Sequence, residues 1–166
     1  MNLTEIQTRH AADIAANHGF VAPLVSGLWL GAGASENAHL PPAVVNACTK
    51  WATHAGKAFL ALDDVVDLVD DPSQTGKDAL QDVREGRLSQ PLFNLRRLAS
   101  EEEWREVRNI LGSGSGANMT LFDRRTVLNA ISRHRLVSRT IEAAEFEIKQ
   151  AAQVAATLSP PVLKTG

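Results

Sequence analysis

The chain has 166 residues with no Tyr, five Phe, three Trp and abundant Ala, a composition that disfavours an all-β fold. Its length suits one domain with its own hydrophobic core. Because 17 Lys and Arg stand against 19 Asp and Glu, the net charge of −2 gives no chain-wide attraction to nucleic acid or to an anionic membrane. The single cysteine, Cys48, excludes an internal disulfide and fits a small core residue of an intracellular protein.

The first part of the chain is predicted to form two helices. Apolar residues from Leu3 to Ala15 recur at helical spacing, the polar run Asn17-His18-Gly19 breaks the pattern, and a second helix is expected from about Phe20 to Gly31. The apolar stretch Phe20 to Leu30 is too short to span a bilayer, and the N-terminus lacks the features of a signal peptide. We therefore expect a soluble, cytoplasmic protein without a transmembrane segment.

A long helix is predicted after a loop from Gly31 to Leu40. Pro41 and Pro42 suit a helix start, and apolar residues keep the helical pattern from Ala43 to about Val69. Pro72 ends this helix, and a polar stretch without a predicted helix follows as far as Gln90.

The second half of the chain is predicted to be helical as well. One helix is expected from about Leu92 to Ala99, and another from Glu101 to Leu111 with Ser100 as its N-cap. The segment 112–118 is rich in Gly and Ser and indicates a linker, because the lysine of a P-loop is missing. Helix then continues from Thr120 to about Leu158 with a break near His134. With no strand signal, the pattern predicts an all-α helical bundle, residues 1–166 forming one domain.

Aspartates gather at the end of the long helix, at Asp63, Asp64, Asp67, Asp70 and Asp71. The spacing places Asp63, Asp64 and Asp67 on one helix face, and we expect them at the edge of a cavity beside buried Phe59 and Leu62. These charges repel one another and stand at the negative end of the helix dipole. We therefore expect a bound cation to offset the repulsion, and the oxygen-only ligands favour Mg²⁺. The alternative is a solvated acidic helix end.

Cationic side chains follow the aspartates at Lys77, Arg84 and Arg87. A turn between Pro72 and Gly76 could fold them back over the metal. Metal and cations together would make a clamp for a diphosphate, whereas the alternative is an ordinary surface loop of mixed charge.

The segment Ala58 to Asp67, the triplet Thr75-Gly76-Lys77 and the segment Asp82 to Leu92 resemble the second aspartate-rich motif and following loop of the trans-isoprenyl diphosphate synthases, the polyprenyl synthetase family. The flanking helices resemble the C-terminal half of the isoprenoid synthase fold, so this chain would match only that half.

The resemblance implies roles for individual residues. Asp63, Asp64 and Asp67 would coordinate Mg²⁺, and Asp63, Asp64 and Lys77 would be catalytic. Lys77 would bind the allylic diphosphate, and Arg87, which stands where the family usually has Lys, would also bind substrate.

The resemblance also implies a reaction. In this family an allylic prenyl diphosphate loses its diphosphate, and isopentenyl diphosphate attacks the resulting cation, which elongates an isoprenoid chain. Metal and cations would stabilise the charge developing on the leaving diphosphate. The substrates implied are therefore a prenyl diphosphate and isopentenyl diphosphate.

The departures from the family pattern point to an incomplete or partner-dependent enzyme. Nothing here corresponds to the first aspartate-rich motif, Gly19-Phe20 replaces the usual Lys-Thr pair, and Leu60 replaces a Gln. We expect a homo- or hetero-oligomer that covers the apolar faces of the helices Phe20 to Leu30 and Ala43 to Val69. The alternatives are a non-catalytic subunit of a heteromeric prenyl diphosphate synthase and a terpene-cyclase-like enzyme.

The arginines of the late helices carry a weaker signal. Arg124, Arg125, Arg133, Arg135 and Arg139 have only Phe122 as an aromatic neighbour. A solvated face or a subunit contact is therefore favoured over nucleic-acid binding.

Overall fold

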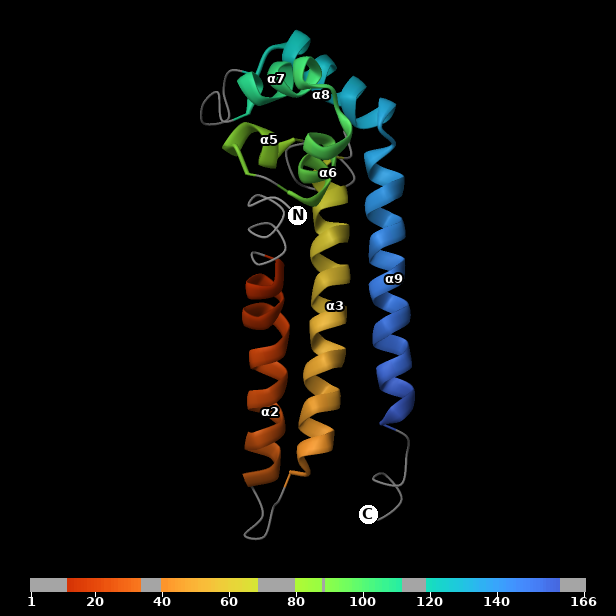
Figure 1. Ribbon diagram of the computed structural model, residues 1–166. Coiled ribbons are helices and arrows are strands. Elements are labelled where there is room, and N and C mark those ends of the chain that lie inside the picture. Colours follow the sequence, from red (N-terminus) through yellow and green to blue (C-terminus); the bar gives the residue numbers. More distant parts are fainter. Residues whose placement is uncertain (1–11, 34–39, 69–79, 88, 112–118, 159–166) are drawn as a thin grey trace. The chain divides into compact units, whose positions relative to one another are not determined.

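The computed structural model describes residues 12–33, 40–68, 80–87, 89–111 and 119–158, and every regular element in these ranges is helical (Figure 1). The elements are the π-helix η1 (Asn17–Val21) and the α-helices α2 (Ala22–Gly33), α3 (Pro42–Leu68), α5 (Gln81–Glu85), α6 (Gln90–Leu98), α7 (Glu101–Ile110), α8 (Leu121–Arg133) and α9 (Leu136–Thr157). The predicted all-α fold is confirmed. None of the described helices has the length and apolar character needed to cross a membrane.

Local capping explains where the helices of the second half begin. At the start of α7 the Ser100 hydroxyl accepts a hydrogen bond of 3.2 Å from the Glu103 amide. Thr120 and Asp123 form a reciprocal capping box at the start of α8. The predicted break near His134 is confirmed, because α8 ends at Arg133 and α9 begins at Leu136.

Two segments differ from the sequence-based expectation. The run Asn17-His18-Gly19 does not end the first helix, because the chain stays helical from residue 12 through η1 and into α2. A π-helical turn lets the helix continue where the α-helical pattern fails. The short helix α5 lies within the polar stretch for which no helix was predicted.

The described helices belong to two compact units, one within Ala61–Glu142 (unit 1) and one built from parts of Arg9–Leu60 and Ala143–Gly166 (unit 2). Helices α3 and α9 contribute residues to both. The hydrophobic core lies in unit 1 and consists of Leu68, Leu80, Val83, Leu92, Leu95, Trp104, Val107, Ile110, Val127, Ala130, Ile131 and Leu136. The assignment of residues 1–166 to one domain stays a prediction.

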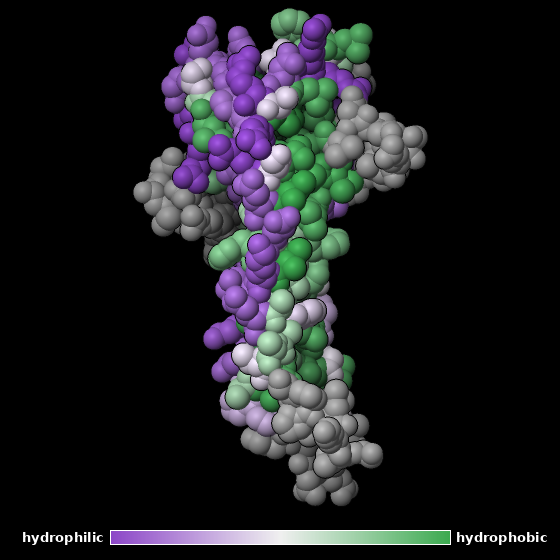
Figure 2. All heavy atoms as spheres, turned by 90° about the vertical axis from the view of Figure 1, so that its right-hand side faces the viewer, coloured by the Kyte–Doolittle hydropathy of each residue, from purple (hydrophilic) through white to green (hydrophobic). Residues whose placement is uncertain are grey.

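Unit 2 buries only small residues in its described part. These are Ala16, Ala52, Gly56, Ala58, Ala144 and Ala151. Helix α2 has no charged residue and no buried residue. Large apolar side chains of unit 2 are exposed instead, among them Trp29, Leu30 and Phe146. Figure 2, in which α9 faces the viewer, shows hydrophobic surface exposed beside a strip of hydrophilic side chains.

Within unit 2, α3 lies between the N-terminal helical segment and α9 (Figure 1). The Phe20 ring packs against Gly56, where an added Cβ would approach the ring to 2.9 Å. Phe20 also contacts the Phe59 ring, with 5.4 Å between ring centroids. The Lys57 ammonium pairs with Asp13 at 2.6 Å, and His54 Nδ1 meets the Glu147 carboxylate at 2.6 Å.

Candidate functional site

Asp67, in the last turn of α3, uses both carboxylate oxygens to bind backbone amides at the start of α5. Its Oδ1 accepts a hydrogen bond of 2.9 Å from the Gln81 amide, and its Oδ2 accepts one of 3.1 Å from the Asp82 amide. The main-chain carbonyl of Asp67 accepts a further bond of 2.8 Å from the Leu80 amide. Asp67 is only 7% exposed. It therefore acts as the N-terminal cap that α5 lacks in its own sequence, since Leu80 offers no capping oxygen.

Asp64, one turn earlier on α3, has the same relation to α6. Its Oδ2 accepts a hydrogen bond of 2.8 Å from the Gln90 amide, the first of α6. Ser89 occupies the N-cap position, yet its hydroxyl makes no cap bond and is buried without a hydrogen-bond partner among the described residues. An aspartate from a distant helix therefore caps α6 in place of the local serine.

Asp63 and its apolar neighbours differ from what the sequence predicts. Asp63 is exposed, although it takes part in contacts of its own. Phe59 is 56% exposed and Leu62 is 39% exposed, so the expectation that both are buried is wrong. Leu62 lies in unit 1 ahead of Leu68, the first α3 residue of that core, and Phe59 belongs to unit 2, which buries only small residues in its described part.

The carboxylates at the end of α3 raise one another's proton affinity. Burial raises the pKa of Asp64 to about 6, and the charges of Asp82, Asp63 and Asp67 add to the rise, while the Gln90 amide opposes it. Burial and the Asp67 carboxylate also raise the pKa of Asp82. Burial thus makes the ionised form of both carboxylates costly, and their mutual repulsion adds to that cost, which a bound cation would offset.

The predicted cationic residues are described only in part. Arg87 is exposed and pairs with Glu85 at 2.6 Å and with Asp82 at 3.9 Å, so it neutralises acidic residues of α5. Arg84 is half-buried and has interactions of its own. Lys77, Asp70 and Asp71 lie outside the described residues, and their predicted roles stay predictions.

The side chains present fit Mg²⁺ only if other oxygens complete its coordination. In the described ranges no group of three His, Cys, Asp or Glu residues is arranged to hold a metal ion. Asp67 uses both oxygens on amides, whereas Asp63 is exposed and Asp64 Oδ1 accepts no hydrogen bond in the described part of the chain. One or two carboxylates suffice where substrate phosphates supply further ligands. The donor set therefore fits Mg²⁺ shared with a diphosphate.

Backbone amides offset part of the negative charge at the end of α3, in addition to any bound cation. Sequence reasoning missed this contribution. Asp64 and Asp67 face amides at the N-terminal ends of α6 and α5, where the helix dipole is positive. These bonds connect residues 14 to 26 positions apart, so no local pattern indicates them. Asp82 was also missed as a member of the acidic group, although it lies in the segment that carries the family resemblance.

Gly19, Phe20 and Leu60 stand where the family resemblance implies polar substrate contacts. Gly19 lies in η1, and the Phe20 ring packs on Gly56 and Phe59. Leu60 is half-buried on α3. None of the three positions carries a hydrogen-bonding side chain, and at Phe20 the chain has apolar packing instead.

Comparison with known proteins agrees with the fold and the motif. Residues 21–123 match the polyprenyl synthetase family. The fold is similar to the crystal structure of geranylgeranyl pyrophosphate synthetase from Pyrococcus horikoshii Ot3, with a TM-score of 0.58 and 23% sequence identity. That match covers 70% of this chain and 34% of the other. No curated protein sequence matches the chain.

This chain therefore spans about a third of the length of that solved relative, in agreement with the expectation that it corresponds to only part of a family member. The family match covers residues 21–123, more than half of the sequence, and includes α3 with Asp63, Asp64 and Asp67. The chain belongs to the polyprenyl synthetase family.

Proposed function

We propose that the chain takes part in isoprenoid chain elongation as the portion of a cytoplasmic prenyltransferase that binds the diphosphate of an allylic prenyl diphosphate. Isopentenyl diphosphate would be the second substrate. The observation that carries the proposal is the carboxylate group at the end of α3, where burial and, after it, the nearby charges of Asp82, Asp63 and Asp67 raise the pKa of Asp64 to about 6. A divalent cation with its diphosphate would offset that charge.

Each residue has a proposed part in this binding. Asp63 and the second oxygen of Asp64 hold Mg²⁺, which neutralises charge on the departing diphosphate. Asp67 holds the start of α5 and reaches the metal through water. Lys77 and Arg87 contact the diphosphate, and Arg87 must then exchange its present pairing with Glu85 for the substrate.

Calorimetry tests this site directly. Magnesium titrated into the protein should bind weakly, and much more tightly when inorganic diphosphate is present. Asp63→Ala should remove the difference, whereas Glu145→Ala, an exposed acidic residue on α9, should keep it. Equal magnesium affinity with and without diphosphate would contradict the proposed site.

The exposed surface of unit 2 supports partner dependence. Its described interior contains only Ala and Gly, while Trp29, Leu30 and Phe146 are exposed. A helix that is apolar on all sides, as α2 is, normally lies inside a larger core. We therefore propose that further helices, from a second copy or another polypeptide, cover this surface and complete the substrate cavity.

Light scattering and an activity assay together test partner dependence. The protein should form a dimer or larger assembly in solution. Condensation of an allylic diphosphate with isopentenyl diphosphate should require a partner chain of the same family that supplies the first aspartate-rich motif. A monomer with full activity alone would contradict the proposal.

A non-catalytic subunit of a heteromeric prenyl diphosphate synthase is the second candidate. It is favoured by the Phe20 contacts with Gly56 and Phe59, which put apolar packing where a substrate-binding Lys-Thr pair is expected. The two candidates differ in the effect of Asp63→Ala on an assembled complex. Loss of activity supports the catalytic role, and unchanged activity with unchanged assembly supports the non-catalytic one.

A further inference from the structure

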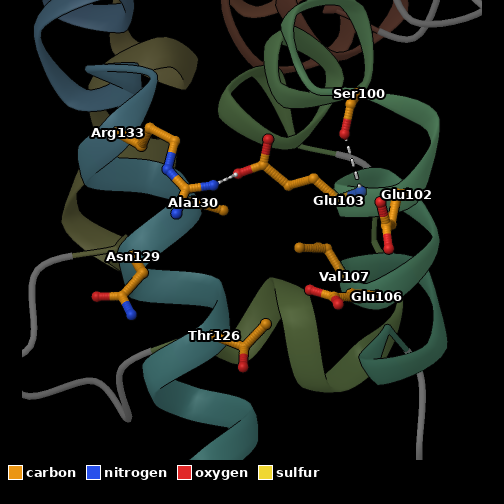
Figure 3. Close-up of a pocket in the computed structure, with 9 residues that line it drawn as sticks. All are labelled: Ser100, Glu102, Glu103, Glu106, Val107, Thr126, Asn129, Ala130 and Arg133. Atoms are coloured by element: carbon orange, nitrogen blue, oxygen red, sulfur yellow. Dashed lines mark hydrogen bonds and ion pairs between the residues drawn. The ribbon is translucent and has the colours of Figure 1, made fainter.

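Ser89 and Ser100 occupy the same position at the starts of two helices of unit 1, but they use their hydroxyls differently. The Ser100 hydroxyl accepts a hydrogen bond of 3.2 Å from the Glu103 amide of α7, at the wall of a pocket between α7 and α8 (Figure 3). The Ser89 hydroxyl makes no cap bond to α6 and has no hydrogen-bond partner in the described ranges.

The backbone of Ser89 is already in the conformation that a capping serine needs. Ser89 has φ of −66° and ψ of 166°, and Ser100 has φ of −63° and ψ of 160°. A capping oxygen ordinarily binds the amide of the second or third helical residue, and Pro91 at the second position of α6 has no N–H. Leu92 therefore holds the amide equivalent to that of Glu103, within reach of the Ser89 hydroxyl after a side-chain rotation.

The unused hydroxyl of Ser89 is costly for the protein. Ser89 is only 8% exposed. A buried hydroxyl without a hydrogen bond loses its contacts with water and gains nothing in return. Turning toward the Leu92 amide would remove that cost, so something else in the structure must already serve the start of α6.

Asp64 serves it instead. Its Oδ2 accepts a hydrogen bond of 2.8 Å from the Gln90 amide, the first of α6. The same carboxylate is the Mg²⁺ ligand proposed above, and the present inference rests on that proposed function. A cation on Oδ1 withdraws negative charge from the carboxylate and weakens its bond to the Gln90 amide. The cation is also repelled by the positive N-terminal end of α6. Metal binding by Asp64 and capping of α6 by Asp64 therefore compete.

We propose that Ser89 is a positioning residue whose hydroxyl caps α6 when Asp64 binds Mg²⁺. Without the metal, Asp64 binds the Gln90 amide and the Ser89 hydroxyl is unused. When the cation takes Asp64, Ser89 Oγ turns to accept the Leu92 amide. The first turn of α6 then keeps a capping oxygen, the buried hydroxyl gains a partner, and Asp64 turns to the metal without loosening the helix.

The amide NMR signals of Gln90 and Leu92 report this exchange in the full-length protein. Titration with magnesium and inorganic diphosphate together should move the Leu92 amide proton to lower field, because it gains a hydrogen bond, and the Gln90 amide proton to higher field. In Asp63→Ala, which should not bind magnesium with diphosphate, neither signal should move. Binding by the unmodified protein with both signals unchanged would overturn the exchange and leave the proposed function intact, whereas absence of binding would contradict both.

Ser89→Ala and Ser100→Ala form a matched pair of variants. Without ligand, Ser100→Ala removes a cap bond and should lower the urea midpoint of unfolding, while Ser89→Ala should leave it unchanged or raise it. In calorimetry with diphosphate present the order reverses. Ser89→Ala should weaken magnesium binding about fivefold, the factor that one capping hydrogen bond is worth, and Ser100→Ala should leave it unchanged.

Two results with these variants would overturn the proposal. Without ligand, an equal fall of the urea midpoint in both variants would show that the Ser89 hydroxyl already caps α6. Unchanged magnesium affinity of Ser89→Ala with diphosphate would show that the hydroxyl does not replace Asp64. Circular dichroism of each variant checks that the helical fold is retained.

Discussion

The Asp67 carbonyl accepts a hydrogen bond of 2.8 Å from the amide of Leu80, a residue held in the left-handed region with φ of 59°. The Leu80 side chain is at the same time buried in the core of unit 1. One residue thus joins the acidic end of α3 to the hydrophobic core, and it does so in a conformation that costs a non-glycine residue roughly 1–2 kcal/mol. Burial of the leucine side chain offsets this cost.

Because the backbone of Leu80 is left-handed, we expect the glycine variant at this position to be more stable than the alanine variant, the reverse of the usual order in a helix. Leu80→Ala and Leu80→Gly both remove the buried side chain, which costs about 2–5 kcal/mol. At ordinary helical positions glycine is less favourable than alanine, but here glycine relieves the strain of positive φ. We expect Leu80→Gly to unfold at a higher urea concentration than Leu80→Ala, by about 1 kcal/mol in free energy of unfolding. The opposite order would show that the strain is absent.

The capping role of Asp67 predicts a loss of stability on truncation. Asp67→Ala leaves the amides of Gln81 and Asp82 without acceptors and should lower the free energy of unfolding by about 2 kcal/mol. Asp67→Asn keeps one acceptor oxygen and should lose less. Urea unfolding followed by circular dichroism measures both, with Glu145→Ala, an exposed acidic residue on α9, as the control. Equal unfolding midpoints for Asp67→Ala and the unmodified protein would contradict the capping role.

The raised pKa of Asp64 predicts a pH dependence of stability. Because the pKa rises from 3.8 to about 6 on folding, the folded state binds a proton more tightly than the unfolded state. The stabilisation from this group is therefore complete below pH 3.8 and is lost as the pH rises through about 6. Carbon NMR of the Asp64 carboxyl, recorded with a chelator present, should show a midpoint near pH 6.

The variant Asp64→Asn cannot titrate, so its free energy of unfolding should fall less between pH 4 and pH 7 than that of the unmodified protein. Ser132→Ala, at an exposed position on α8 without a titratable group, should keep the original slope. Identical slopes for Asp64→Asn and the unmodified protein would exclude Asp64 as the source.

Two glycines in unit 2 should respond oppositely to alanine. At Gly56 a new Cβ would lie 2.9 Å from the Phe20 ring and 3.0 Å from the Ala16 methyl, so Gly56→Ala forces these groups apart and should cost about 1–3 kcal/mol. At Gly27 no atom of the described residues lies within 4 Å of a new Cβ, so Gly27→Ala should add about 1 kcal/mol through helix propensity. Thermal unfolding by circular dichroism would measure both changes, and a stabilising Gly56→Ala would refute the close packing.

Sequence reasoning predicted the elements that depend on local signals. Ser100 with Glu103, and Thr120 with Asp123, mark helix starts within four residues of chain, and the structure has helices there. It failed where contacts between residues far apart in the sequence determine the local structure. The unpredicted helix α5 is capped by Asp67 from another helix. The chain also stays helical through the polar run that was expected to break it, and there the Phe20 ring packs on Gly56.

In the candidate site, too, the features set by local sequence could be predicted and those set by distant contacts could not. The placement of Asp63, Asp64 and Asp67 on the last turns of a long helix follows from their spacing. The attachment of two of them to backbone amides depends on how the later chain folds back, which spacing does not encode. Their roles in metal and substrate binding stay predictions.

The small-residue interior of unit 2 has a consequence for how its helices align along their axes. Helices that touch through methyl groups and glycine hydrogens present nearly smooth surfaces to each other. The packing of such surfaces changes little when one helix slides along its neighbour, so packing alone favours one alignment only weakly. Lys57 with Asp13, and His54 with Glu147, join α3 to the helical segments on either side of it. Polar pairs of this kind can fix register where packing does not. Register in unit 2 thus depends on these polar pairs together with the Phe20 ring packed on Gly56, and salt weakens the Lys57–Asp13 pair, whereas the packing of larger apolar side chains fixes the register in unit 1.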